Sequence, residues 1–139
     1  MDIYTKTILE LASSIPYTVR LSNPDISVTK RTAVCGSSIT VDLDIKNAKI
    51  EKIGLDVKAC ALGQASASIF AKNAIGLNLK EVRNLRIQLN EFLKTGNFKV
   101  KTPFGEYKYL DPARAVPYRH DSIMLIIDST EEGLADFLT

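Results

Sequence analysis

Two cysteines are the residues of this sequence best suited to metal or sulfur chemistry. Cys35 is followed 25 positions later by Cys60. Thiolates are soft ligands for zinc and iron, and they are also the nucleophiles of sulfur transfer. Two isolated cysteines are equally typical of buried core residues, and a Cys-x-x-Cys pair would indicate a metal more strongly. The pair therefore predicts a candidate metal or sulfur site, with burial in the core as the alternative.

A predicted β-hairpin would bring the two cysteines together. Apolar and polar residues alternate over 39–46 and again over 53–57, as in strands that bury one face. The segment 47–49 between them predicts a turn. Cys35 precedes the first strand and Cys60 follows the second. Because the strands are antiparallel, we expect the two cysteines to lie a short distance apart in space.

The residues next to the cysteines favour a binding site at this end of the hairpin. Gly36 can adopt backbone angles that other residues avoid, which suits a close approach to a bound ion. A run of small residues without proline predicts a helix over about 61–73, with Gly76 in its C-cap region. Cys60 would then stand at a helix N-terminus, which favours the thiolate that binds metals.

The segments before the hairpin predict a short helix and one further strand. Apolar residues at helical spacing predict a helix over 3–12, which Ile15-Pro16 ends. A short strand is expected over 17–21, followed by a turn at 23–25. Together with the hairpin, this strand gives a small antiparallel sheet of about three strands.

The segments after the hairpin predict helices that cover the sheet. A near capping box at Asn78–Glu81 begins a helix that Gly96 ends. Residues 97–109 are expected as a loop or short extended segment, and 121–138 as a last helix with Gly133 as a candidate break. Strands followed by a block of helices indicate the α+β class, and the length suits one domain over residues 1–139.

Composition excludes several classes of function. The formal net charge of +2 is too small to indicate binding to nucleic acid or to an anionic membrane. No run of about 18 apolar residues predicts a membrane span. The first sixteen residues lack the apolar segment of a secretory signal, so a cytoplasmic, reducing location is expected. There, two cysteines are more often thiols or metal ligands than a disulfide.

Several segments resemble the U-type iron–sulfur assembly scaffolds, which are the SufU, IscU and NifU N-terminal proteins. The cysteine segments 34–39 and 60–68 carry the resemblance. The sequence of 64–68 and the insertion 76–96 are most similar to the SufU branch. Residues 117–125 resemble the family's Pro-Ala-Arg-x-x-Cys-x-x-Leu segment. The likeness extends over nearly the whole chain and implies the small α+β fold of that family.

The resemblance also implies a set of ligands. In the family, three cysteines and an aspartate hold a nascent cluster or a zinc ion, and Cys35 and Cys60 match the first two cysteines. Ser37 stands at the position of the aspartate, and Ser122 stands at the position of the third cysteine. Since neutral serine is a poor ligand for iron or zinc, two of the four ligands are lost at these motif positions.

The residues just before Ser122 are candidates to replace the lost ligands. A one-residue shift of the loop would bring Asp121 or His120 into the site, giving Cys2Asp, Cys2His or a set of all four. A lone histidine is more often a surface or capping residue, and Asp121 could simply cap the last helix. Arg119 is a candidate for orienting a persulfide or an acidic partner, with an ordinary solvated position as the alternative.

The resemblance implies a binding protein, not an enzyme. It would take sulfur from a cysteine desulfurase, hold a transient iron–sulfur cluster through Cys35 and Cys60, and support transfer to recipient proteins. Both cysteines are also candidate sulfur acceptors. Two alternatives stay open, namely a zinc-binding sulfur acceptor of the desulfurase and a metal-free adaptor that docks it. The sequence leaves the oligomeric state open.

Overall fold

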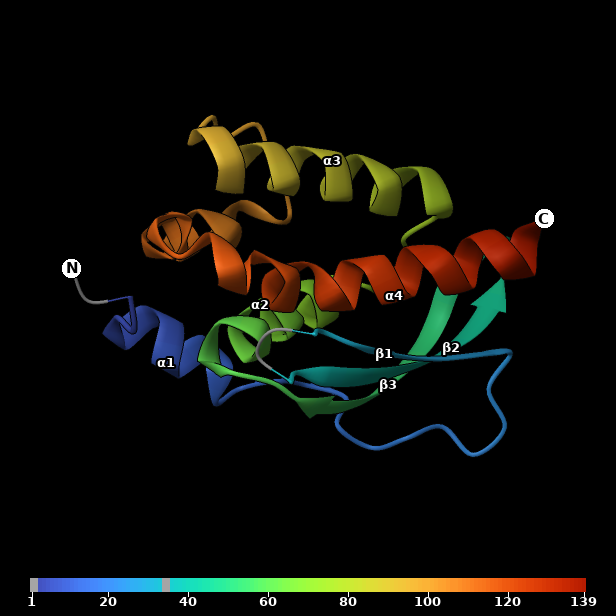
Figure 1. Cartoon of the computed structure of the whole chain (residues 1–139). Helices are drawn as coiled ribbons and strands as arrows, with labels where there is room; N and C mark the ends of the chain where they lie inside the picture. The colour runs from blue at the N-terminus through green and yellow to red at the C-terminus, as the bar shows by residue number, and fades with distance from the viewer. Residues whose placement is uncertain (1–2, 34–35) are drawn as a thin grey trace.

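The computed structural model describes residues 3–33 and 36–139 and shows a sheet covered on one face by helices (Figure 1). The predicted α+β class with a three-stranded antiparallel sheet is confirmed. The elements in chain order are α1 (Lys6–Ala12), β1 (Ile26–Arg31), β2 (Ser38–Lys46), β3 (Lys49–Lys58), α2 (Ala61–Lys72), α3 (Leu79–Thr95), the 3-10 helices η1 (Gly105–Ala115) and η2 (Pro117–Arg119), and α4 (His120–Leu138).

The central strand of the sheet is β2, which pairs with β1 on one side and β3 on the other. Alternation along β2 buries Ile39, Val41 and Leu43 against the helices. The predicted hairpin between β2 and β3 is present, and its turn residues Asn47 and Ala48 both have positive φ angles, 54° and 62°. Two such residues match the right-handed twist of the flanking strands, which fixes the register of the hairpin.

The first strand differs from the prediction. Residues 17–21 form no strand, and the sheet begins instead with β1 at Ile26–Arg31. Tyr17 has a φ angle of 59°, which is incompatible with extended strand geometry, and its carbonyl accepts from the N–H of Leu55 at 2.8 Å. The segment 13–25, called here the N-terminal strap, therefore crosses the outer face of the sheet as irregular chain.

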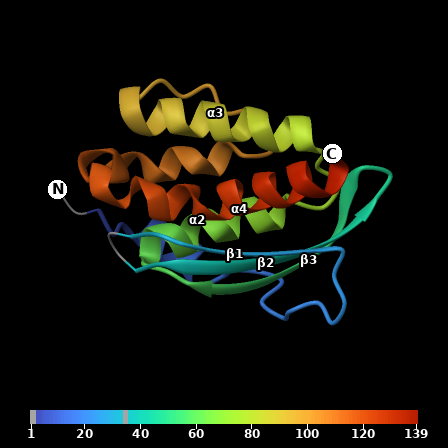
Figure 2. The same cartoon turned by 45° about the vertical axis from the view of Figure 1, so that its right-hand side comes forward.

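Helices α2 and α4 cover the inner face of the sheet, and α3 lies beyond α4 as a further layer (Figure 2). Gly133 does not break α4, contrary to the candidate break expected from its type. A Cβ atom at Gly133 would lie 2.6 Å from Cγ2 of Ile26 and 3.1 Å from Cγ2 of Val28. The glycine therefore serves close packing of α4 on β1, which offsets its low helix propensity.

The boundaries of the helices follow their capping residues. The Asn78 side chain accepts from the N–H of Glu81 at 2.9 Å, and Glu81 accepts from the N–H of Asn78 at 3.1 Å, which completes the predicted capping box. Gly96 ends α3 in the left-handed conformation. Helix α2 ends at Lys72 with Asn73 as its C-cap, so Gly76 is not its cap. The predicted loop over 97–109 is shorter than expected, because η1 begins at residue 105.

A buried carboxylate ties the N-terminal strap to the sheet. Asp42 on β2 is fully buried and accepts from Nε of Arg20 at 2.6 Å, Nη2 of Arg20 at 3.1 Å and Oγ of Ser27 at 2.7 Å. The N–H of Leu21 donates to it at 3.1 Å. Gly54, the β3 partner of Asp42, leaves room for the strap, since a Cβ there would lie 2.6 Å from the carbonyl oxygen of Val19.

Candidate functional site

Three of the four ligand positions implied by the resemblance converge at one end of the sheet. Oγ of Ser122 donates to Oγ of Ser37 at 3.2 Å, and the backbone N–H of Cys60 donates to the same Oγ of Ser37 at 3.4 Å. Both serines are 2% exposed, whereas Cys60 is half-buried. The structure thus gathers residues 37, 60 and 122 around one point, and Cys60 is the most exposed of the three.

Local structure fixes each of these three positions. Ser37 directly precedes β2, where Ser38 pairs with Lys58 on β3, and Cys60 then caps the N-terminus of α2. Thr32 holds the turn before β2, because its N–H donates to the carbonyl of Ser37 at 2.8 Å and its Oγ1 accepts from the N–H of Ser37 at 3.1 Å. The hairpin register therefore dictates that Ser37 lies against Cys60.

The first turn of α4 brings Ser122 to this point. It packs on the first turn of α2 at Gly63, where a Cβ would lie 3.1 Å from the carbonyl oxygen of Ser122 and 3.5 Å from its Cβ. The close approach of the two helices depends on the missing side chain of Gly63. This rotation of α4 turns position 122, and not position 121, toward Ser37.

Cys35 lies outside the described residues, together with Val34. The expectation that the hairpin brings Cys35 close to Cys60 therefore stays a prediction. The described residues nearest to it in sequence are compatible with it, since Ser37 lies two positions further along and contacts Cys60.

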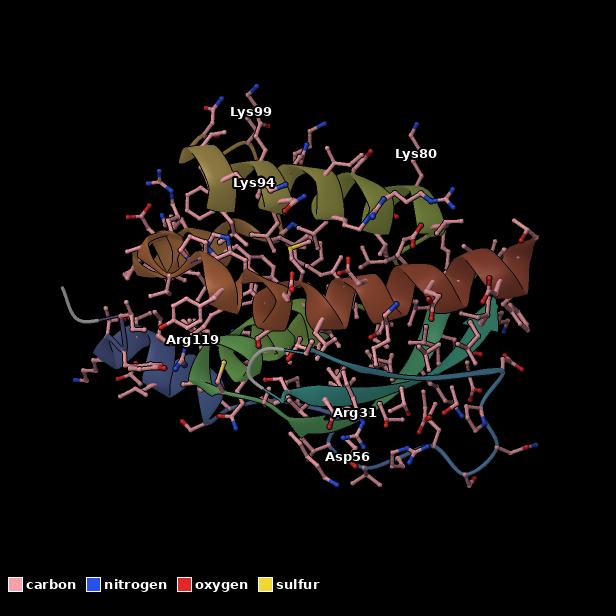
Figure 3. The ribbon with its side chains drawn as sticks, viewed as in Figure 1. Arg31, Asp56, Lys80, Lys94, Lys99 and Arg119 are labelled. Carbon is pink, nitrogen blue, oxygen red and sulfur yellow. The ribbon has the colours of Figure 1, made fainter. Side chains whose placement is uncertain are left out.

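Arg119 lies beside the site, between α1 and the start of α4 (Figure 3). Its Nη1 donates to the hydroxyl of Tyr4, and its guanidinium lies 5.8 Å from the ring centroid of Tyr4 and 5.7 Å from that of Tyr118. A hydrogen bond with Tyr118 is the main cause that raises the pKa of Arg119, and the Coulomb attraction of Cys60 is a smaller one. The two rings hold a fixed positive charge near the Cys60 thiol.

His120 and Asp121 lie elsewhere. Nε2 of His120 is 2.9 Å from the carbonyl oxygen of Ala113, and both His120 and Asp121 line a pocket between α4 and α3. Within residues 3–33 and 36–139, no group of three or more His, Cys, Asp or Glu side chains is placed to hold a metal ion. A ligand role for His120 or Asp121 stays a prediction, and for His120 it would fall to Nδ1, because Nε2 contacts the carbonyl of Ala113.

The donor set of the described site does not complete a tetrahedral metal centre. Cys60 supplies one thiol, and the two serine hydroxyls are neutral oxygens that already bond to each other. Zinc and iron–sulfur sites need thiolate, imidazole or carboxylate ligands. Even with the predicted ligand Cys35, two ligands would have to come from other residues or from outside the chain.

Sequence reasoning missed the residues that support the site. Thr32, Gly63 and Tyr4 act through backbone contacts or through partners distant in sequence, and none of them belongs to a recognisable pattern. Only Gly63 carried a signal, as a glycine inside a predicted helix, because such a glycine often marks a close packing contact.

Comparison with known proteins places this geometry in a family. No protein-family model matches the sequence. The crystal structure of a nitrogen-fixing NifU-like protein (N-terminal) from Brucella abortus superimposes with a TM-score of 0.93 and 34% identity, covering 98% of this chain and 94% of that one. The iron–sulfur cluster assembly scaffold protein IscU of Thermotoga maritima is 24% identical over 96 residues, which are 69% of this chain and 68% of that protein.

A SufU structure from Fervidobacterium islandicum AW-1 has the same fold, with a TM-score of 0.84 and 18% identity over 95% of this chain and 96% of its own. The chain belongs to the U-type iron–sulfur cluster assembly scaffold family of IscU, SufU and NifU N-terminal proteins. Among the helices of the described residues, none combines the length and apolar character needed to cross a bilayer.

Proposed function

We propose that this chain takes part in the assembly or transfer of iron–sulfur clusters and binds its cargo at the site of Cys60. The observation that carries the proposal is the convergence of Cys60 with Ser37 and Ser122, the motif positions of the family's ligands. Membership in the scaffold family and the 34% identity to the NifU-like protein support it. The role is binding and transfer of a cargo, not turnover of a substrate.

The chemistry of the site sets how that cargo would be held. The Cys60 thiolate would be one ligand, and we propose Cys35 as the second. The serines at 37 and 122 supply no charge, so the remaining ligands would come from small thiols, a partner protein, or a rearranged His120 and Asp121. Such a site binds a cluster weakly, which suits a cargo that is passed from a cysteine desulfurase to recipient proteins.

Anaerobic reconstitution tests this function directly. The purified chain, incubated with ferrous iron, sulfide and a small thiol, should develop the visible charge-transfer absorption of a thiolate-bound cluster. The variant Cys60→Ser should lose that absorption almost completely, because it removes a thiolate at the centre of the site. If the unmodified chain shows no such absorption at any thiol concentration, cluster binding by this chain is rejected.

A second candidate function is sulfur acceptance without a metal, and the position of Arg119 favours it. The Cys60 thiolate would attack the outer sulfur of a desulfurase persulfide, form a new S–S bond and release the desulfurase thiolate, with no net oxidation. The positive charge of Arg119, fixed between the two tyrosine rings, would stabilise the resulting terminal persulfide anion. A bound zinc ion, the alternative with four ligands, is disfavoured by the two serines.

Sulfur acceptance predicts a mass change on Cys60. After incubation with a cysteine desulfurase and cysteine, the chain should gain the mass of one sulfur atom, and Cys60→Ser should gain none if Cys60 is the acceptor. Arg119→Ala should slow the gain by about tenfold, which corresponds to about 1.4 kcal/mol for a charge-assisted interaction. Lys58→Ala is a control that removes a nearby exposed cation. A gain that persists undiminished in Cys60→Ser would contradict the assignment, and no gain in any variant would favour a metal-free docking adaptor.

A further inference from the structure

We propose that the pocket between α3 and α4 binds a small molecule that carries a carboxylate or phosphate group. The pocket has a volume of about 550 Å³, which lies in the range of small-molecule sites. It opens on the side of α4 opposite to Ser122 and is therefore separate from the Cys60 site. Its charged and ionisable lining residues are Arg86, Lys94, Arg114, His120, Asp121 and Asp128.

One end of the pocket gathers three nitrogen-bearing side chains. The guanidinium of Arg114 lies against the C-terminus of α3, where a Cβ at Gly96 would be 2.5 Å from its Nη2. Lys94 lies two residues before Gly96 at this same end of α3. His120 contacts the carbonyl of Ala113, the residue before Arg114. Three side chains from three elements thus surround one end of the pocket.

At this end of the pocket, some hydrogen-bond donors have no acceptor within the described residues. Nε of Arg114 is buried and has no hydrogen-bond partner among the described residues, while its Nη1 donates to Oδ1 of Asp111 at 3.3 Å in an exposed ion pair. Lys94 forms no ion pair with any described residue. A buried donor without an acceptor costs about 1–3 kcal/mol. The Arg114 side chain is about one third exposed as a whole, so a small turn of its guanidinium would bring Nε onto a ligand oxygen and relieve that cost.

The same two helices do form ion pairs elsewhere. Nε of Arg83 on α3 donates to Oε1 of Glu131 on α4 at 3.0 Å, within about one turn of the pocket residues Arg86 and Asp128. Opposite charges across this interface can therefore pair where the side chains meet. The opposite charges that line the pocket form no such pair with each other. The space between them is where a bound ligand would lie.

The other end of the pocket is acidic, which predicts a hydrogen-bond donor on the ligand. Asp128 is flanked by Arg86 and Asp121, and burial raises the pKa of its carboxyl group, with Arg86 acting in the opposite direction. The carboxylates of Asp121 and Asp128 make no hydrogen bond with described residues. They would accept from a donor on the ligand, so the proposed ligand carries an oxyanion at one end and a hydroxyl or ammonium group at the other.

Nuclear magnetic resonance on the whole ¹⁵N-labelled chain tests this site, because an arginine Nε–H gives its own signal. The probes are inorganic phosphate, acetate and phosphoethanolamine, which separate a phosphate, a carboxylate and a phosphate with an added ammonium group. We expect the Arg114 Nε–H signal to shift with a dissociation constant in the millimolar range or below. Phosphoethanolamine should bind at least about threefold more tightly than inorganic phosphate, since only it reaches the carboxylates.

Variants decide whether the binding belongs to this pocket. Arg114→Lys keeps the charge but removes the Nε–H, so binding to the variants is followed by the backbone N–H signals of pocket residues such as Asn90. Combined with Lys94→Ala, it should weaken binding by about tenfold or more. Lys94→Ala alone, at an exposed position, should weaken it by about threefold and guards against misfolding of the double variant. Lys99→Ala is the matched control, because Lys99 points away from α4 (Figure 3) and faces Glu91 at 3.8 Å. The proposal is overturned if no probe shifts the Arg114 signal, or if Lys99→Ala weakens binding as much as Lys94→Ala.

Discussion

Replacing Ser37 by aspartate and Ser122 by cysteine together should convert the chain into one that retains about one zinc ion through purification. The double variant restores the two ligands that the family motif has at these positions. Four-ligand structural sites gain about 10–16 kcal/mol from zinc, so two added ligands should tighten zinc binding by at least about 1,000-fold. Each single variant should fall between the unmodified chain and the double variant.

The geometry of the two serines supports this expectation. Their Oγ atoms are 3.2 Å apart, and two ligands of one tetrahedral zinc ion, bound through oxygen and sulfur, are about 3.5 Å apart. The backbone therefore already holds both positions at a spacing that one ion can bridge. Without metal, the buried aspartate at position 37 lacks a counter-charge and should lower the stability of the variant.

Metal content by mass spectrometry and thermal unfolding with and without zinc measure the outcome. Zinc should raise the unfolding temperature of the double variant by many degrees and leave the unmodified chain nearly unchanged. The control variant Ser129→Cys places a thiol on the same helix, away from the site, at another buried position. If the Ser129→Cys control binds as much zinc as the double variant, or if the double variant binds none, positions 37 and 122 do not form the ligand set.

Replacing Arg20 by alanine should reduce the free energy of unfolding by about 1–3 kcal/mol. The change removes the counter-charge and two hydrogen bonds from the Asp42 carboxylate, and a buried acceptor that loses its partner costs about that much. The Arg20 side chain is half-exposed, so water can replace part of it, and Ser27 and the N–H of Leu21 remain as donors. Arg83→Ala breaks an ion pair at the surface and should cost no more than about 1 kcal/mol.

The loss should depend on pH. Burial acts to raise the pKa of Asp42, but the hydrogen bonds from Arg20, Ser27 and Leu21 outweigh it, so the pKa lies below its usual value. A carboxyl whose pKa is lowered by folding stabilises the protein above the pKa of the unfolded chain, about 3.9. That contribution disappears as the pH falls through the folded pKa. Denaturant unfolding at neutral and acidic pH should therefore show the Arg20→Ala difference shrinking in acid, and a constant difference would contradict this origin.

Much of the fold could be predicted from local patterns. The hairpin, the α2 and α3 helices and the capping box of Asn78 follow from alternation, helical spacing and capping residues, which act over a few positions. The first strand could not be placed, because 17–21 and 26–31 have similar composition. Burial of Asp42 by the N-terminal strap decides between them, and that contact joins residues 22 positions apart.

The site could be predicted only in part. The resemblance to the family's motifs identified positions 37, 60 and 122, and the structure brings these three together. Which residue of the pair Asp121 and Ser122 faces the site depends on the rotation of α4, which the contact with Gly63 sets. The hydrogen bond from Arg119 to Tyr4 joins residues 115 positions apart, and no local sequence pattern predicts such a contact.

Binding of an iron–sulfur cargo at Cys60 is the central claim, and native mass spectrometry under anaerobic conditions tests it most directly. The chain is reconstituted with iron, sulfide and a small thiol, transferred to a volatile buffer that still contains the thiol, and weighed beside the Cys60→Ser variant treated in the same way. We expect a species heavier by iron and sulfide for the unmodified chain and the bare chain for Cys60→Ser, with both folded. The same bound mass on Cys60→Ser, or none on either chain, would contradict the assignment of the site.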